Sequence, residues 1–130
     1  MEILSTFSGF SVDDAAAAKA FYVEKLGLDI GDESMGLQLK LPGGSTVFIY
    51  EKPDHSPASY TMLNLVVEDI DAAVDELVAK DIAFEQYGDM GNGAKQDEKG
   101  VLRGLAADMG PDIAWIKDPA GNIVGILQDA

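Results

Sequence analysis

Cysteine is absent from this sequence of 130 residues. The chain therefore cannot form a disulfide framework, a thiolate metal site or a cysteine nucleophile, and it is compatible with a reducing cytoplasm. It also lacks any apolar run near the roughly 20 residues that a membrane-spanning helix needs. We therefore expect a soluble, cytoplasmic protein that does not insert into a membrane.

Positive charge is scarce. The sequence contains 9 Lys and Arg residues and 23 Asp and Glu residues, so its formal net charge is -14. Arg103 is the only arginine. Phosphate backbones and anionic lipid headgroups need basic contacts, so nucleic acid and membrane surfaces are not expected partners. The acidity could attract a cationic ligand, although a solvated and self-repelling surface is the commoner explanation.

Histidine is nearly absent as well. His55 stands alone in a segment with two prolines, where a surface position is expected. The sequence contains no Ser-His-Asp set, no pair of metal-spaced histidines and no phosphate-binding glycine loop. No catalytic residue is predicted.

What the sequence does contain is an internal repeat. Val12-Asp13-Asp14, followed by alanines, is echoed by Val67-Glu68-Asp69, and each phrase joins a strand-like run to a helix-like run. Asp13 or Asp14 is placed to cap the first helix, and Asp69 the second. The pattern predicts two βαβββ modules in an α+β domain. Two copies of such a module can enclose a cavity that neither builds alone.

The predicted boundaries follow from apolar periodicity and turn residues. Strands are expected at 3–12, 28–30, 35–41, 46–51, 60–67, 82–87, 113–116 and 123–127, with helices at 15–26 and 70–78. We expect one domain, 1–130, made of module 1 (1–52), a linker (53–59) and module 2 (60–130). The irregular segment 88–112 is expected to be a lid over the cavity or plain surface, and 101–103 could add a short strand.

The sequence resembles the vicinal oxygen chelate superfamily, which includes glyoxalases, bleomycin-resistance proteins and extradiol dioxygenases. The resemblance lies in Val12-Asp13-Asp14, in Phe21 to Leu28, in Val67 to Asp71 and in Asp118 to Ile123. It implies that the two modules form an open, curled mixed sheet around a ligand cavity. It also implies a homodimer.

Enzymes of this superfamily hold a divalent metal with side chains from four strands. In this chain the corresponding positions are Phe7, Ile49 (or Glu51 in a register two residues later), Met62 and Gly125. At most one hard oxygen ligand remains, which is too few for a zinc or non-haem iron site. The resemblance therefore implies neither a metal nor another cofactor here.

The period-2 rule extends the inward face from these positions. It adds Gly9 and Asn64, which lie two residues along the same strands. Trp115 could stack on a flat ligand, although core packing is its commoner role. The predicted ligand-binding residues are Phe7, Gly9, Ile49, Glu51, Met62, Asn64, Trp115 and Gly125. They describe an apolar cavity with Glu51 and Asn64 as polar groups.

The resulting hypothesis is a metal-independent small-molecule-binding protein, similar to the drug-sequestering branch of the superfamily, that sequesters a hydrophobic or cationic ligand. The alternative is a lyase, isomerase or dioxygenase-like enzyme that uses Glu51 and relocated metal ligands. A third hypothesis is a catalytically silent partner subunit.

Overall fold

The computed structural model describes residues 1–88, 90 and 94–130. The chain forms two compact units, Met1–Pro57 and Ala58–Ala130, and the boundary between them falls inside the predicted linker. Each unit is described by itself below. In the described ranges no helix is long and apolar enough to cross a membrane.

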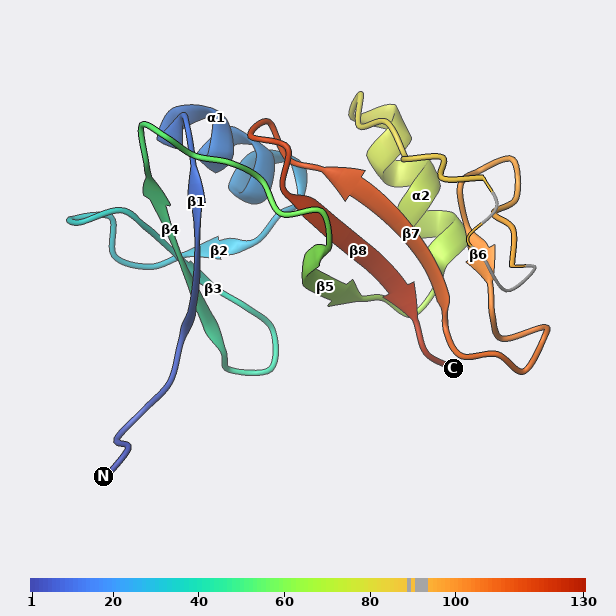
Figure 1. Ribbon diagram of the computed structural model, residues 1–130, viewed down its shortest axis with the longest axis horizontal. Coiled ribbons are helices and arrows are strands. Elements are labelled where there is room, and N and C mark those ends of the chain that lie inside the picture. Colours follow the sequence, from blue (N-terminus) through green and yellow to red (C-terminus); the bar gives the residue numbers. More distant parts are fainter. Residues whose placement is uncertain (89, 91–93) are drawn as a thin grey trace. The chain divides into compact units, whose positions relative to one another are not determined.

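Unit 1 is a βαβββ module (Figure 1). Its elements are β1 (Ser8–Val12), α1 (Ala15–Lys19), η1 (Ala20–Lys25), β2 (Asp29–Ile30), β3 (Leu37–Lys40) and β4 (Thr46–Glu51). The sheet order is β1-β4-β3-β2, with β1 and β4 parallel and the other pairs antiparallel. The predicted single helix ends in a wider π-helical turn, and Gly27 follows it with a positive φ of 73°.

Unit 2 repeats this plan. Its elements are β5 (Thr61–Val66), α2 (Ile70–Ala79), β6 (Leu102–Arg103), β7 (Asp112–Lys117) and β8 (Ile123–Gln128). The order β5-β8-β7-β6, with β5 and β8 parallel, matches that of unit 1 strand for strand. The predicted α+β class, with two βαβββ modules in open mixed sheets, is confirmed.

The two helices start in the same way. Asp14 and Asp69 are N-caps whose carboxylates accept hydrogen bonds from Ala17 N and Ala72 N, both at 3.1 Å. The strand that comes last in the sequence of each module, β4 or β8, supplies a second hydrogen-bond acceptor at the start of the helix. Glu51 Oε1 accepts from Ala15 N (2.8 Å), and Gln128 Oε1 accepts from Ile70 N (2.9 Å). Each module therefore ties the end of its last strand to the start of its helix.

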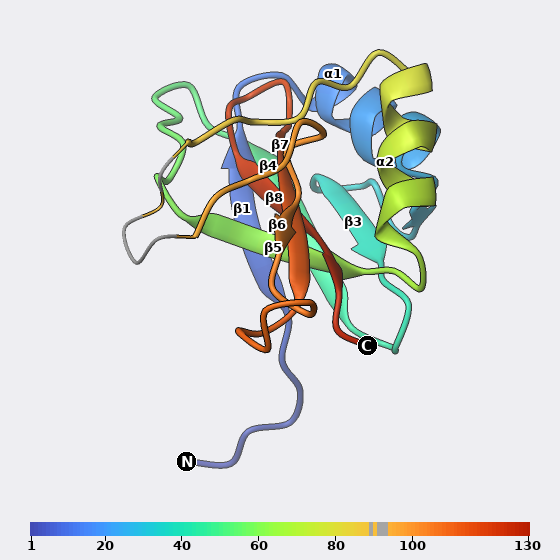
Figure 2. The same cartoon turned by 90° about the vertical axis from the view of Figure 1, so that its right-hand side faces the viewer.

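One face of each sheet packs on the helix. In β4, Val47 and Ile49 are buried, and Ile49 is in register with Phe10, whose ring contacts Tyr22 of η1 at 5.6 Å. The core of unit 2 combines α2, which lies along its sheet in Figure 2, with alternate residues of β7 and β8. The opposite face of each sheet does not pack on the helix of its unit. The unit 2 core includes Ile70, Val74, Leu77, Ala114, Ile116, Val124 and Ile126.

Three segments show where the predicted strand boundaries hold and where they do not. The first strand begins at Ser8 rather than at Ile3. The strand predicted at 82–87 reduces to a single bridge between Phe84 and Ile116, supported by Glu85 N donating to Trp115 O (2.8 Å). The short strand expected near 101–103 is present as β6.

Candidate functional site

A cavity of about 330 Å³ lies on the face of the unit 1 sheet that does not pack on the helix. It is lined by Phe7, Asp32, Ser34, Met35, Gln38, Thr46 and Phe48. Thr46 and Phe48 alternate along β4 with the buried Val47 and Ile49, which explains why they face the cavity rather than the core. Apolar side chains with a few convergent polar groups are typical of a small-molecule site.

The loop between β2 and β3 shapes one side of this cavity. Gly31 N donates to Gln38 O (2.7 Å), and Gln38 N donates to Asp32 O (3.1 Å), so the loop continues the pairing of the two strands. A Cβ atom added at Gly36 would lie 2.7 Å from the Phe48 ring and 2.8 Å from Ile49 O. Glycine at this position therefore lets the loop approach the aromatic ring closely.

Asp32 is the charged residue among those that line the cavity. Asp32 Oδ1 accepts from Ser34 N (2.7 Å), and Asp32 N donates to Gln38 Oε1 (3.3 Å). The hydrogen bonds from Ser34, the backbone one first, lower the pKa of Asp32, because they stabilise its charged form. The cavity therefore has an ionised carboxylate at neutral pH.

Two of the predicted site residues of unit 1 lie on the cavity face. Phe7 lines the cavity and is 69% exposed. Gly9 is in register with Phe48, and a Cβ atom there would lie 3.2 Å from Phe48 O. Gly9 thus allows close approach of the two strands at the floor of this face.

The other two predicted residues of unit 1 belong to the opposite face. Ile49 is 1% exposed and packs on the helix side of the sheet, so it does not line a cavity with Phe7. Glu51 holds the first amide of α1. A shift of one residue along a strand exchanges its two faces. The predicted Ile49 and the observed cavity residue Phe48 differ by this one-residue shift in β4.

Phe48 lines the cavity but is missing from the residues predicted from the sequence. Val47-Phe48-Ile49 in β4 matches Val124-Gly125-Ile126 in β8, and Phe48 pairs with Gly9 as Gly125 pairs with Asn64. The similarity between the last strands of the two modules is therefore the signal that places Phe48 at the family position.

The predicted residues of unit 2 gather on its own helix-free face. Asn64, Gly125 and Trp115 are neighbours across β5, β8 and β7. Trp115 Nε1 donates to Thr61 Oγ1 (3.0 Å), and the Tyr87 ring meets Trp115 edge-on at 5.6 Å. Met62 lies where the β5 register shifts between Thr61 and Leu63. Trp115 is thus held mainly by packing and one hydrogen bond.

The family metal positions, corrected for register, carry Phe7, Phe48, Met62 and Gly125. These side chains offer no carboxylate, imidazole or thiolate. In the part of the chain that the structure describes, no group of three or more His, Cys, Asp or Glu residues could hold a metal ion. The residues at these positions do not fit a divalent metal.

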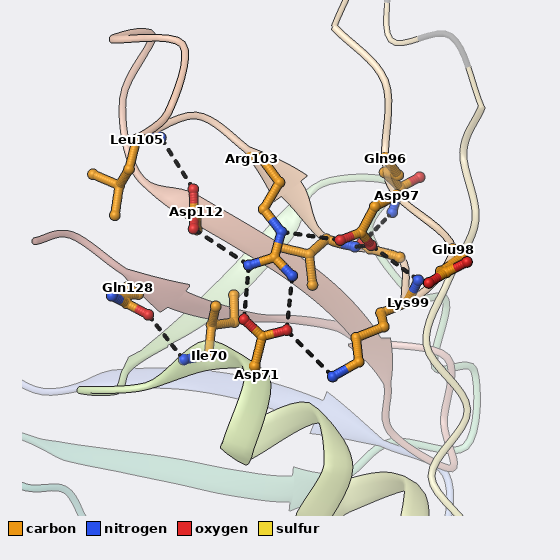
Figure 3. A network of polar contacts seen from close by, with 12 residues as sticks. Ile70, Asp71, Gln96, Asp97, Glu98, Lys99, Arg103, Leu105, Asp112 and Gln128 are labelled. Carbon is orange, nitrogen blue, oxygen red and sulfur yellow. Dashed lines mark hydrogen bonds and ion pairs between the residues drawn. The ribbon is translucent and has the colours of Figure 1, made fainter.

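Arg103 is the centre of a network that ties three segments of unit 2 together (Figure 3). Its guanidinium donates twice to Asp71 of α2 (3.0 and 2.8 Å), and its Nε donates to Asp97 Oδ2 (2.9 Å). Asp112 Oδ2 at the start of β7 lies 3.5 Å from Arg103 Nη1. Lys99 Nζ lies 3.2 Å from Asp71 Oδ1. The bidentate geometry is one that arginine provides and lysine does not.

These contacts shift the pKa values of their members. Hydrogen bonds from Arg103 and then from Lys99 lower the pKa of Asp71 to about 2. The bond to Asp71 raises the pKa of Arg103. Burial alone would raise the pKa of Asp97, but hydrogen bonds from Val101 N, Arg103 and Lys99 N outweigh it and lower that pKa. All three groups are charged at neutral pH.

The Arg103 network includes residues of the segment 88–112, which the sequence predicts to be a lid or plain surface. Residues 89 and 91–93 of that segment lie outside the described residues. The following part folds back at Gln96 and Leu102, and Gln96 Nε2 donates to Glu85 O (2.9 Å) and Gly100 O (2.6 Å). With Arg103 bound to α2, residues 96–103 belong to the framework of unit 2. They lie beside a second cavity of about 450 Å³ lined by Met90, Ala94, Lys95, Leu102, Arg103, Gly104, Ala107 and Met109.

Residues 5–126 match the protein family described as the Glyoxalase/Bleomycin resistance protein/Dioxygenase superfamily. The chain belongs to this superfamily. The resemblance inferred from the sequence is thereby confirmed. No curated protein sequence matches the chain.

Solved structures of this superfamily are similar over nearly the whole chain. The antibiotic binding protein TnmS3 from Streptomyces sp. CB03234 is 26% identical, with a TM-score of 0.65 and 100% of both chains covered. A glyoxalase/bleomycin resistance protein from the same organism is also 26% identical, with a TM-score of 0.61, 95% of this chain and 100% of that chain covered. A superfamily member from Sphaerobacter thermophilus DSM 20745 is 20% identical, with a TM-score of 0.65 and 97% and 98% covered, and shows the shared fold.

Proposed function

We propose that this protein is a metal-independent small-molecule-binding protein that sequesters a hydrophobic or cationic ligand. The carrying observation is the unit 1 cavity, in which Phe7, Met35 and Phe48 form apolar walls beside a small number of polar groups. Apolar walls supply affinity for a ligand, and the polar groups fix its orientation.

Metal independence is supported by the chemistry of the four family positions. Phenylalanine, methionine and glycine cannot assemble the nitrogen and oxygen ligand set of a zinc or non-haem iron site. The enzymatic alternative requires Glu51 and relocated metal ligands. Since Glu51 Oε1 accepts from Ala15 N at the start of α1, we leave Glu51 out of the proposed site. We also leave out Ile49, because it is buried on the helix side of the sheet.

The likeness to TnmS3 supports binding rather than catalysis. That protein is an antibiotic binding protein, and the two chains cover each other completely at 26% identity. We further propose a cytoplasmic homodimer. The absence of cysteine from the sequence fits the cytoplasm, and exposed apolar side chains such as Leu4, Val66 and Val78 favour a partner surface.

The experiment is a ligand screen by thermal shift, followed by calorimetry with purified protein and with a Phe48→Ala variant. Ligands of the proposed site should bind the parent and lose affinity in Phe48→Ala. Tyr60→Ala, which removes an exposed aromatic ring from unit 2, is the matched control and should retain affinity. Elemental analysis accompanies the screen. A stoichiometric divalent ion required for binding, or equal binding by both variants, would contradict the proposal.

A further inference from the structure

The Asp32 carboxylate lies at the edge of the unit 1 cavity. Its neighbour Glu33 forms an ion pair with Lys19 at 2.9 Å. Among the described residues, by contrast, no Lys, Arg or His side chain is paired with Asp32. The Asp32 carboxylate accepts a hydrogen bond from Ser34 N of the same loop, which fixes the carboxylate in place. The backbone N of Asp32 donates to Gln38 Oε1 of β3.

The backbone hydrogen bond from Ser34, together with the Ser34 side chain, lowers the pKa of this carboxyl. The group therefore keeps a full negative charge at any physiological pH. A neutral ligand without a hydrogen-bond donor gains little from this charge, and an anionic ligand is repelled by it.

Part of the wall of the same cavity is aromatic. Phe48 lines the cavity, and its ring is stacked on Tyr50 with centroids 5.9 Å apart and an angle of 21° between the planes. Phe7 lines the same cavity. Aromatic faces attract cations through their quadrupole.

We propose that the unit 1 cavity selects flat organic cations, namely N-alkylated heteroaromatic or aryl ammonium compounds. The apolar body packs against Phe48 and Phe7, and the positive charge lies next to Asp32. This inference rests on the proposed function and specifies the class of ligand.

The net charge of -14 attracts any cation toward the whole surface, so the test must separate the cavity from the general field. Asp32→Asn removes the charge but retains an oxygen that can accept from Ser34 N, which preserves the loop. Asp13→Asn is the matched control, because it removes the same charge from an exposed residue of unit 1 that does not line the cavity.

The probes are N-methylacridinium and acridine, a cation and a neutral compound of nearly the same shape. Their fluorescence is titrated with protein at mildly alkaline pH, where acridine is uncharged, and at moderate salt. We expect the parent to bind the cation more tightly. Asp32→Asn should weaken binding of the cation about two- to fivefold, the range for exposed ion pairs, without changing that of acridine. Asp13→Asn should behave like the parent, and thermal melts confirm that both variants are folded.

Three results would overturn the inference: equal affinity of the parent for both probes, equal effects of the two substitutions, or no binding of N-methylacridinium. Binding of acridine without a cation preference would leave the proposed function standing. The ligand screen with Phe48→Ala decides that function separately, since it does not depend on ligand charge.

Discussion

The side-chain oxygen of Asn64 occupies the space directly above Gly125. The two residues are in register on the parallel strands β5 and β8, and Thr61 Cγ2 closes the same space, 3.3 Å from where a Cβ atom of residue 125 would lie. The volume that glycine leaves at this family position is therefore taken up by the protein's own side chains.

This relationship predicts the effect of filling the position. Gly125→Leu should lower the free energy of unfolding by about 1 to 3 kcal/mol, because Asn64 and Thr61 must move to admit the new side chain. Urea denaturation measures the loss. Asn64→Ala in the same background should recover part of it, and a double-mutant cycle with strictly additive effects would show that the two side chains do not compete for the space.

Glu51 offers a matched pair of variants. Glu51→Gln should leave the free energy of unfolding nearly unchanged, since a glutamine oxygen can accept from Ala15 N just as Gln128 accepts from Ile70 N in unit 2. Glu51→Ala should cost about 1 kcal/mol, as other lost helix-start acceptors do. Thermal and urea unfolding provide the comparison. A ligand affinity that falls equally in both variants would instead assign Glu51 to the binding site.

The Arg103 network predicts a dependence of stability on acid. The pKa of Asp71 is lowered from 3.8 to about 2, so its contribution is fully present above pH 3.8 and is lost as the pH falls toward 2. Asp71 is 48% exposed and Arg103 33%, so solvent screening limits this contribution to the order of 1 kcal/mol.

The substitution Arg103→Gln tests this dependence. It should destabilise the protein at neutral pH, and its difference from the parent should shrink across the interval from pH 3.8 to 2, where Asp71 becomes protonated. Urea titrations at several pH values give the difference. Lys40→Gln, which removes an exposed cation of unit 1, is the control. A difference that stays constant with pH would disconnect Arg103 from Asp71.

The same network predicts slow hydrogen exchange in the segment 96–103. Val101 N donates to Asp97 Oδ1 at 2.9 Å, and Val101 is fully buried. Its amide should exchange on the timescale of the α2 amides and become faster in Arg103→Gln. Exchange as fast as that of Met1–Phe7, which has no secondary structure, would mean that residues 96–103 open freely as a lid.

The proposed homodimer is tested by sedimentation. β1 and β5 each stand at the end of their sheet, and exposed strand edges in soluble proteins are commonly covered by a partner. The parent should sediment at twice its 13.8 kDa at micromolar concentration. A monomer throughout that range would contradict the expectation.

The sequence by itself determined the features that depend on neighbours along the chain. Asp14 and Asp69 cap their helices as predicted, because an N-cap needs only its own carboxylate and an amide three residues later. The repeat of Val12-Asp13-Asp14 in Val67-Glu68-Asp69 likewise marked both modules. Local pattern also placed most strands, since alternation of apolar and polar residues is a property of short segments.

The tertiary structure decided which face of β4 meets the cavity, because Phe48 and Ile49 are both apolar and β4 alone does not say which one the helix covers. The match between β4 and β8 that identifies Phe48 becomes clear once the strand pairing of both modules is known. The tertiary structure also placed Asn64 over Gly125 and brought Arg103 to Asp71, whose contact spans 32 positions of the chain. Such contacts depend on strand pairing and on packing between elements, and these are set by the free energy of the whole module rather than by any local segment.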